Sequence, residues 1–177
     1  MVARALTFRP GRWTGAVLVA LALAVLLFQQ SLRRDRWMRG APGSADELVF
    51  TLDADAAIRG WVSESHPTLL VGCRRAEPLE FVVQTRMAAV VEPGDQRSVR
   101  YWFDDDAPAT TSWTQARNRQ SLAAPGADAR ALAERLSRAG RFTFAYVPFN
   151  ADPAVVTFTT HGFDAHWREL QERCAGG

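Results

Sequence analysis

The chain has 177 residues, a length that fits one domain plus an appendage, so a second domain is not indicated. Hydrophobic residues make up 47% of it and six residues are tryptophan, which excludes a disordered chain, because disordered segments are polar and poor in aromatics. All 21 basic residues are arginine, and seven of them flank an apolar run near the N-terminus, leaving 14 in a chain with 19 acidic residues. The folded part is therefore mildly acidic, which argues against nucleic-acid binding.

The apolar run is long enough to cross a membrane. Residues 13–32 carry no charge, and about 20 such residues are what a helix needs to span a bilayer. A cleavable signal peptide is the alternative, but residues 28–33 contain no small-x-small cleavage site. A buried core helix is less favoured, because arginines flank the run on both sides. We predict a short basic tail at 1–12 and an uncleaved transmembrane signal anchor at 13–32.

The charges around the anchor do not decide its orientation. Three arginines and the α-amino group precede it and four arginines follow it, so the positive-inside rule nearly cancels. The seven are Arg4, Arg9, Arg12, Arg33, Arg34, Arg36 and Arg39. Topology must therefore be inferred from the cysteines.

After the anchor, residues 33–44 form a linker by composition, ending in the sequence RGAPGS. We place one β-rich domain at 45–177. Short runs in which apolar and polar residues alternate predict about seven strands, the number typical of a β-sandwich or a partly open barrel. Seven of the runs lie at 48–52, 68–74, 79–84 and 99–104, around 113, and at 142–146 and 155–160, and two weaker ones lie at 58–63, which contains Gly60, and near 122, which is short.

Alternation within these runs predicts which side chains face the core. Leu69, Val71 and Cys73 share one face of the run at 68–74, because side chains alternate with period two in a strand. Three other runs each have such a face. It is formed by Leu79, Phe81 and Val83 in the first, by Val99, Tyr101 and Phe103 in the second, and by Phe142, Phe144 and Tyr146 in the third.

Two packed helices interrupt the strands, so the fold class is mainly β (α+β). Asp128 can cap the first helix, whose apolar residues recur at helical spacing up to Leu136 before Gly140 ends it. The second runs over about 163–173. Its apolar stripe consists of Phe163, Trp167, Leu170 and Cys174.

The periodicity turns both cysteines toward the core, Cys73 on a strand and Cys174 on a helix. We predict a disulfide between them, because an even pair beside an export-like N-terminus is typical of oxidising compartments. Two free buried cysteines, acting as small hydrophobic residues, are the alternative. With the anchor, the disulfide predicts a single-pass protein of the bacterial inner membrane whose C-terminal domain lies in the periplasm. Reduced cysteines would indicate a cytoplasmic domain.

Two groups of residues are candidates for chemistry. Asp104, Asp105 and Asp106 could hold a cation, but an acidic turn that ends a strand is usually solvated. His161 and His166 are five positions apart, unlike the i, i+4 pair of a zinc helix. The chain contains no G-x-S-x-G, no H-E-x-x-H and no phosphate-binding glycine loop. We expect no enzyme, and hence no catalytic residue, no cofactor and no metal.

A binding patch is the preferred hypothesis for a site. Arg100 and Trp102 lie on the predicted outer face of one strand, and these residue types dominate interface hot spots. Asp104, at the end of the same run, and Trp113, in the next run, complete the predicted patch. A single exposed tryptophan is also ordinary, so the patch stays a hypothesis.

The β-rich body contains the segments HPTLLVGCRRAEPLEFVV, VRYWFDDDAPATTSW and FTFAYVPFNADPAVVTFTTHGFDAHWRELQERC. In these segments it resembles the VasI, or TagO, family of accessory proteins associated with type VI secretion, over about residues 47–177. The resemblance implies an exported protein with a conserved cysteine pair. The residues that match the family's motifs are Cys73, Cys174, Asp104, Trp113, Phe158 and Gly162.

We therefore expect a membrane-anchored envelope accessory or binding module, whose partner is another envelope protein and whose pathway, by resemblance, is type VI secretion. The alternative is a small hydrolase or metal-dependent enzyme that uses residues 104–106 with His161 or His166. Clustering of those side chains in one pocket would favour the enzyme, and their dispersal would favour the binding module.

Overall fold

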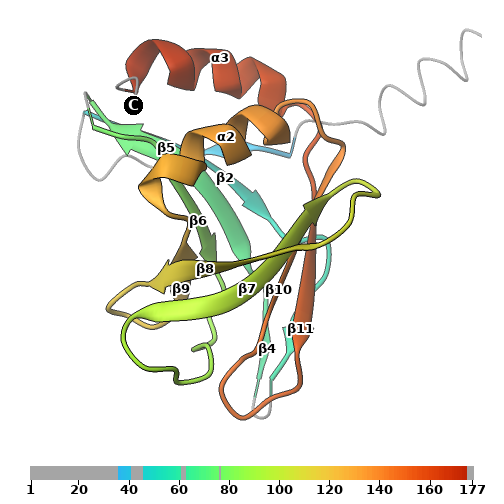
Figure 1. Ribbon diagram of the computed structural model, residues 1–177. Coiled ribbons are helices and arrows are strands. Elements are labelled where there is room, and N and C mark those ends of the chain that lie inside the picture. Colours follow the sequence, from blue (N-terminus) through green and yellow to red (C-terminus); the bar gives the residue numbers. More distant parts are fainter. Residues whose placement is uncertain (1–35, 41–45, 61–62, 76, 175–177) are drawn as a thin grey trace, which may run out of the picture. The chain divides into compact units, whose positions relative to one another are not determined.

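The computed structural model describes residues 36–40, 46–60, 63–75 and 77–174, drawn as ribbons in Figure 1. The chain is divided at residues 34 and 35, and the fold below is that of the second unit, Asp35–Gly177. The predicted basic tail and transmembrane anchor lie outside the described residues. Within the described residues, no helix has the length and apolar character needed to span a membrane.

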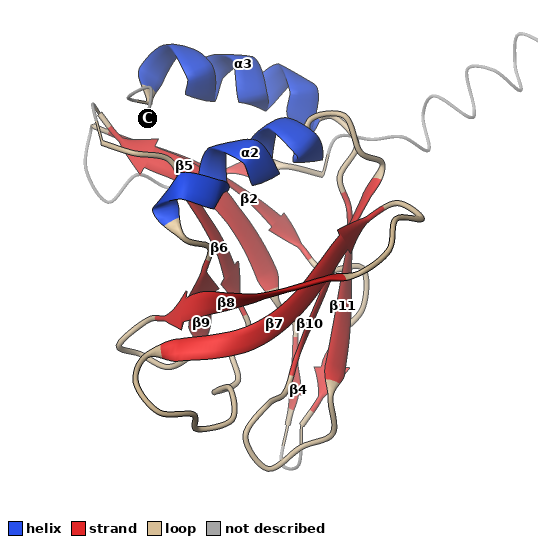
Figure 2. Cartoon of the chain, in the orientation of Figure 1, coloured by secondary structure: helices blue, strands red, loops and turns tan. Residues whose placement is uncertain are grey.

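The second unit is mainly β, as predicted. Eleven strands are described, and nine of them form one antiparallel sheet in the order β1-β2-β5-β6-β9-β8-β7-β10-β11 (Figure 2). The other two, β3 (Ile58–Arg59) and β4 (Glu64–Ser65), pair as a small hairpin. The nine strands are β1 Met38–Arg39, β2 Glu47–Asp53, β5 Thr68–Arg74, β6 Glu80–Gln84, β7 Gln96–Phe103, β8 Ala109–Gln115, β9 Ser121–Ala123, β10 Arg141–Tyr146 and β11 Ala154–Thr159.

A few hydrogen bonds join the two ends of this sheet. Asp55, two residues beyond β2, donates its backbone N–H to the carbonyl oxygen of Thr157 on β11 at 2.8 Å. The Asp55 carboxylate accepts hydrogen bonds from the Thr159 N–H at 3.2 Å and from the Thr159 hydroxyl at 2.9 Å. The indole N–H of Trp37 donates to the carbonyl oxygen of Thr160. Because its first and last strands are linked in this way, the sheet wraps around a single core.

The core is built from the inward face of each strand. Leu69, Val71 and Cys73 are buried on β5, so the predicted alternation is confirmed there. At the centre, the ring of Trp113 on β8 packs against Phe81 on β6, with centroids 5.9 Å apart. Large aromatic rings dominate the energetics of such cores, because each buries far more apolar area than an aliphatic side chain.

The two predicted helices are present, and Figure 1 shows both at the same end of the sheet. Helix α3 (Phe163–Arg173) has the predicted bounds and buries its apolar stripe. Helix α2 (Gly126–Leu136) differs in detail, because Pro125 occupies the N-cap position and Asp128 lies in the first turn. An acidic residue there still favours the helix, since it faces the positive end of the helix dipole. The helix ends before Gly140.

The folded unit begins earlier than the predicted boundary at residue 45. Trp37 is buried, and its ring packs on Phe163 of α3 with centroids 4.5 Å apart. Directly after it, β1 pairs with β2. Residues 33–44 have the average composition of a linker. An average does not show that one member of the segment, Trp37, packs in the core and fixes part of the segment there.

The predicted disulfide is confirmed. Cys73 on β5 and Cys174, which directly follows α3, are bonded across a sequence separation of 101 residues, with Cα atoms 5.7 Å apart. Both cysteines are buried. The bond therefore fixes the C-terminal end of α3 to an interior strand of the sheet.

Replacement of Cys174 by serine should lower the melting temperature by roughly 10–20 °C. In the chain-entropy model, closing a loop of about 100 residues contributes about 4–5 kcal/mol, and each kcal/mol corresponds to roughly 2–4 °C in a protein of this size. Calorimetry of the full chain in detergent measures the change. Cys73→Ser should give the same shift, and the double variant should add nothing further. A melting temperature that does not change under reductant would contradict the expectation.

Tyr146, at the end of β10, is the most perturbed titratable group in the described residues. Its side chain is buried, and its hydroxyl has no partner of good hydrogen-bond geometry among the described residues. Burial raises the pKa of Tyr146 to about 12, an effect that the nearby Thr85 side chain partly offsets. The neutral form is favoured because the phenolate would lose its hydration in this environment.

The domain should lose stability as the pH rises above about 10, the ordinary pKa of tyrosine. The folded state holds the Tyr146 proton more tightly than the unfolded chain, so this contribution is complete below the unfolded pKa and is lost as the pH rises through the folded pKa. The chain has no lysine and both cysteines are bonded, so tyrosine is the side chain that titrates in this range. Tyr146→Phe should make the decline shallower in urea unfolding measured from about pH 8 to about pH 11.5. An equally steep decline in the variant would contradict this assignment.

Candidate functional site

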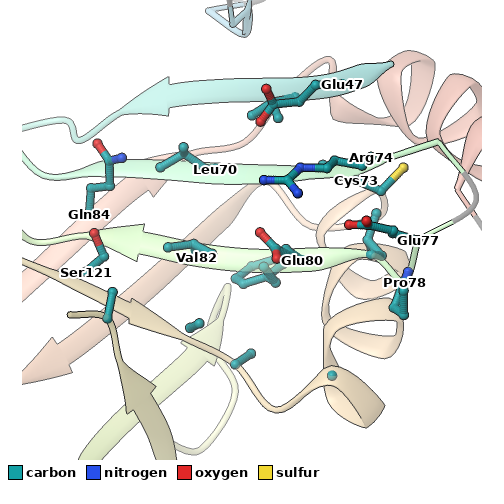
Figure 3. Close-up of a pocket in the computed structure, with 18 residues that line it drawn as sticks. Glu47, Leu70, Cys73, Arg74, Glu77, Pro78, Glu80, Val82, Gln84 and Ser121 are labelled. Carbon is teal, nitrogen blue, oxygen red and sulfur yellow. The ribbon is translucent and has the colours of Figure 1, made fainter. Parts of the chain in front are cut away.

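A groove of about 610 Å³ lies on the outer face of β2, β5, β6 and β9 (Figure 3). Its volume falls within the range of about 300–1,000 Å³ that is usual for binding sites in proteins. The start of α2 at Gly126 and the loop at Ala116 border it on the β9 side. The strand residues Leu70 and Val82, which line it, alternate with core residues, so the groove lies on the side of the sheet opposite the aromatic core.

The floor of the groove is apolar. Leu70 on β5 pairs with Val82 on β6, and Val82 pairs with Ala123 on β9. Cross-strand partners project from the same face of a sheet, so these side chains form a row across three strands. All three are only half-buried, whereas their inward neighbours Leu69 and Val83 are completely buried.

Gly72 keeps one part of the outer face free of a side chain. It lies on β5 between Leu70 and Arg74, and a Cβ atom at this position would collide with the backbone of β2 at Leu48 and Val49. Strand β2 can therefore approach β5 closely only because residue 72 is glycine. The absent side chain contributes to the hollow beside Leu70.

Charged side chains gather at one end of the groove. Glu47 on β2 lies directly opposite Arg74 on β5, and Glu77 and Glu80 lie along the neighbouring edge. In Figure 3 the Arg74 side chain extends along β5 between Glu47 and Glu80. At the other end, Gln84 presents an amide. Three glutamates and one arginine give this end of the groove an excess of negative charge.

The structure separates the four residues of the patch predicted from the sequence. Arg100 is exposed and Trp102 is half-buried on the outer face of β7. Trp113 is fully buried in the core, because it pairs with Arg97 and so shares the inward face of the sheet. We therefore remove Trp113 from the predicted patch.

The carboxylate of Asp104, the fourth member of that patch, is hydrogen-bonded to the backbone. Its Oδ1 accepts hydrogen bonds from the N–H groups of Gly140 and Arg141, both at 3.0 Å. Asp104 has φ of 48°, a left-handed conformation that aspartate tolerates better than most residues. Its role is to close the turn after β7 onto the start of β10. Arg100, which is exposed, and Trp102, which is half-buried, remain together on the outer face.

The acidic turn does not gather its carboxylates at one point. Asp105 pairs with the Arg141 guanidinium at 2.8 Å, and Asp106 pairs with Arg135 of α2. His166 stacks on Phe50, with ring centroids 4.3 Å apart. Among the described residues, no group of three or more His, Cys, Asp or Glu side chains is placed to hold a metal ion.

His161 is the one histidine close to the acidic turn. A Cβ atom on Gly140 would come within 3.1 Å of His161 Cε1 and within 3.5 Å of Asp104 Oδ1, so both side chains border this glycine. However, that Asp104 oxygen is the one that accepts the two backbone hydrogen bonds. The residues proposed for an enzyme are thus divided among a turn, a helix face and two arginine pairs.

The groove is not among the sites predicted from the sequence, although the sequence contains a signal for it. The runs at 68–74 and 80–84 carry apolar residues on both faces, with Leu70 and Val82 on the face opposite the core. A sheet that is covered on one side only normally has polar residues on the other. Apolar residues on both faces therefore indicate a second apolar surface.

Comparisons of the chain with protein-family models, with curated proteins and with solved structures gave no match.

Replacement of Asp104 by glycine should destabilise the domain by about 1–3 kcal/mol, because two backbone N–H groups lose their acceptor. Glycine keeps the left-handed backbone free of strain, so the loss reports the hydrogen bonds. Urea unfolding measures the change. Asp105→Gly is the matched control and should leave the midpoint almost unchanged, since its contact is an exposed ion pair. Equal losses in the two variants would contradict the role given to Asp104.

Proposed function

We propose that this chain is a membrane-anchored binding module of the bacterial envelope, whose β-rich domain faces the periplasm and holds another protein on the outer face of its sheet. The observation that carries the proposal is the groove over β2, β5, β6 and β9, with its half-buried apolar floor and charged end. Contiguous apolar surface that stays accessible to solvent often marks a binding site. Arg100 and Trp102 offer a second, smaller contact surface on the same face of the sheet.

The location in the periplasm is supported by the Cys73–Cys174 disulfide. Structural disulfides persist in oxidising compartments and are rare in the bacterial cytoplasm. The uncharged residues 13–32 supply the proposed anchor, and they place the folded unit after it in the chain. Together these features favour an inner-membrane protein with an exported C-terminal domain.

A place in type VI secretion is the finer form of the proposal, and it rests on the resemblance to the VasI family alone. Genes for a secretion apparatus beside this gene would support it. Their absence would leave an envelope binding module of another pathway.

Topology is tested by fusing alkaline phosphatase after residue 177 of the full chain. We expect an active enzyme, because phosphatase acquires its own disulfides only after export. The same fusion lacking residues 13–32 is the control and should be inactive. A fluorescent, cytoplasm-restricted reporter that is active at the same point would contradict the proposal. A mature protein that has lost the first 30 or so residues would show a cleaved signal instead of an anchor.

A further inference from the structure

We infer that the groove over β2, β5, β6 and β9 binds a protein segment that presents apolar side chains next to a lysine or arginine. The inference rests on the proposed function and specifies the partner of its site. It follows from three properties of the groove: the apolar row on its floor, the unbalanced negative charge at one end, and its extent across four strands.

The apolar row sets the first requirement. Leu70, Val82 and Ala123 lie side by side across three strands and are only half-buried, so further apolar area can be removed from water when a partner binds. Binding is favoured in proportion to the apolar area that it removes from water. A purely polar partner would not bury this apolar surface favourably.

The charged end sets the second requirement. Glu47 faces Arg74 across the β2–β5 ladder, so the excess negative charge comes from Glu77 and Glu80. The described residues form six ion pairs, and neither Glu77 nor Glu80 takes part in any of them. Arg74 is the only arginine among the residues that line the groove, so it can balance no more than one of these carboxylates. A cationic side chain from a partner would be attracted to this end, and an acidic one would be repelled.

The extent of the groove favours a protein segment over other occupants. Four strands spaced by about 4.8 Å span about 14 Å, which an extended chain covers with about four residues. A bacterial membrane surface is anionic and attracts basic patches, so an acidic groove end does not suit it. A nucleic acid is disfavoured for the same reason.

The experiment uses the full chain in detergent micelles and a phage-displayed library of random peptides of about 12 residues, with empty micelles as the negative selection. Enriched peptides should combine apolar residues with lysine or arginine. One enriched peptide is then synthesised, and its affinity for the variants is measured by fluorescence polarisation. Leu70→Arg blocks the floor, and Glu80→Arg reverses the charge at an exposed position where misfolding is not a concern. Each should weaken binding at least about tenfold, because Leu70→Arg removes apolar contact area and Glu80→Arg places two positive charges together.

Ser112→Arg is the matched control, because Ser112 is exposed on the outer face of β8, away from the groove. It should change the affinity by less than about twofold. Enriched peptides without basic residues, no enrichment at all, or affinities that Leu70→Arg and Glu80→Arg leave unchanged would overturn the inference. Peptides lost only on Trp102→Ala would also overturn it while supporting a binding module, and the phosphatase fusion tests the location separately.

Discussion

A covalent bond from Cys73 to Cys174 ties the end of the last helix to β5, a strand with β2 on one side and β6 on the other. At its other end, α3 packs Phe163 against Trp37, whose indole also bonds to the chain beyond β11. The helix is therefore held at both ends, once by a covalent bond and once by packing. Residues from the beginning and the middle of the folded unit therefore both contact its last helix and fix the position of that helix on the sheet.

Strands β5 and β6 carry apolar residues on both of their faces. Inward, Val71 and Phe81 are completely buried in the aromatic core, and outward, Leu70 and Val82 form the floor of the groove. A strand used on one face only would place polar residues at the outward positions without loss of core packing. The outward apolar residues are thus not required by the fold, which is the physical reason to connect them with binding.

Local patterns determined much of what could be predicted from the sequence. Alternation identified the inward face of 68–74, helical spacing gave the bounds of α3, and together they aimed both cysteines at the core. Properties that depend on strand order could not be predicted in this way. Trp113 was assigned to a patch because nothing local shows that it pairs with Arg97, and the groove forms only when β6 pairs with β9. The burial of Trp37 likewise depends on a contact with Phe163, which is distant in the sequence.

The distribution of charged residues indicates which kind of partner suits the groove. Ion pairs in the described residues lie on the hairpin, on the helices, at the turn after β7 and at the chain's entry into the sheet, and all of them use arginine, the only basic residue type besides histidine. Exposed pairs of this kind contribute little stability, so their distribution is not dictated by folding. Glu77 and Glu80 at the groove take part in none of these ion pairs, so their carboxylates can interact with solvent or with a partner. A cation delivered beside apolar side chains would neutralise them in a partly water-excluded setting, where charge pairing is stronger than on an open surface.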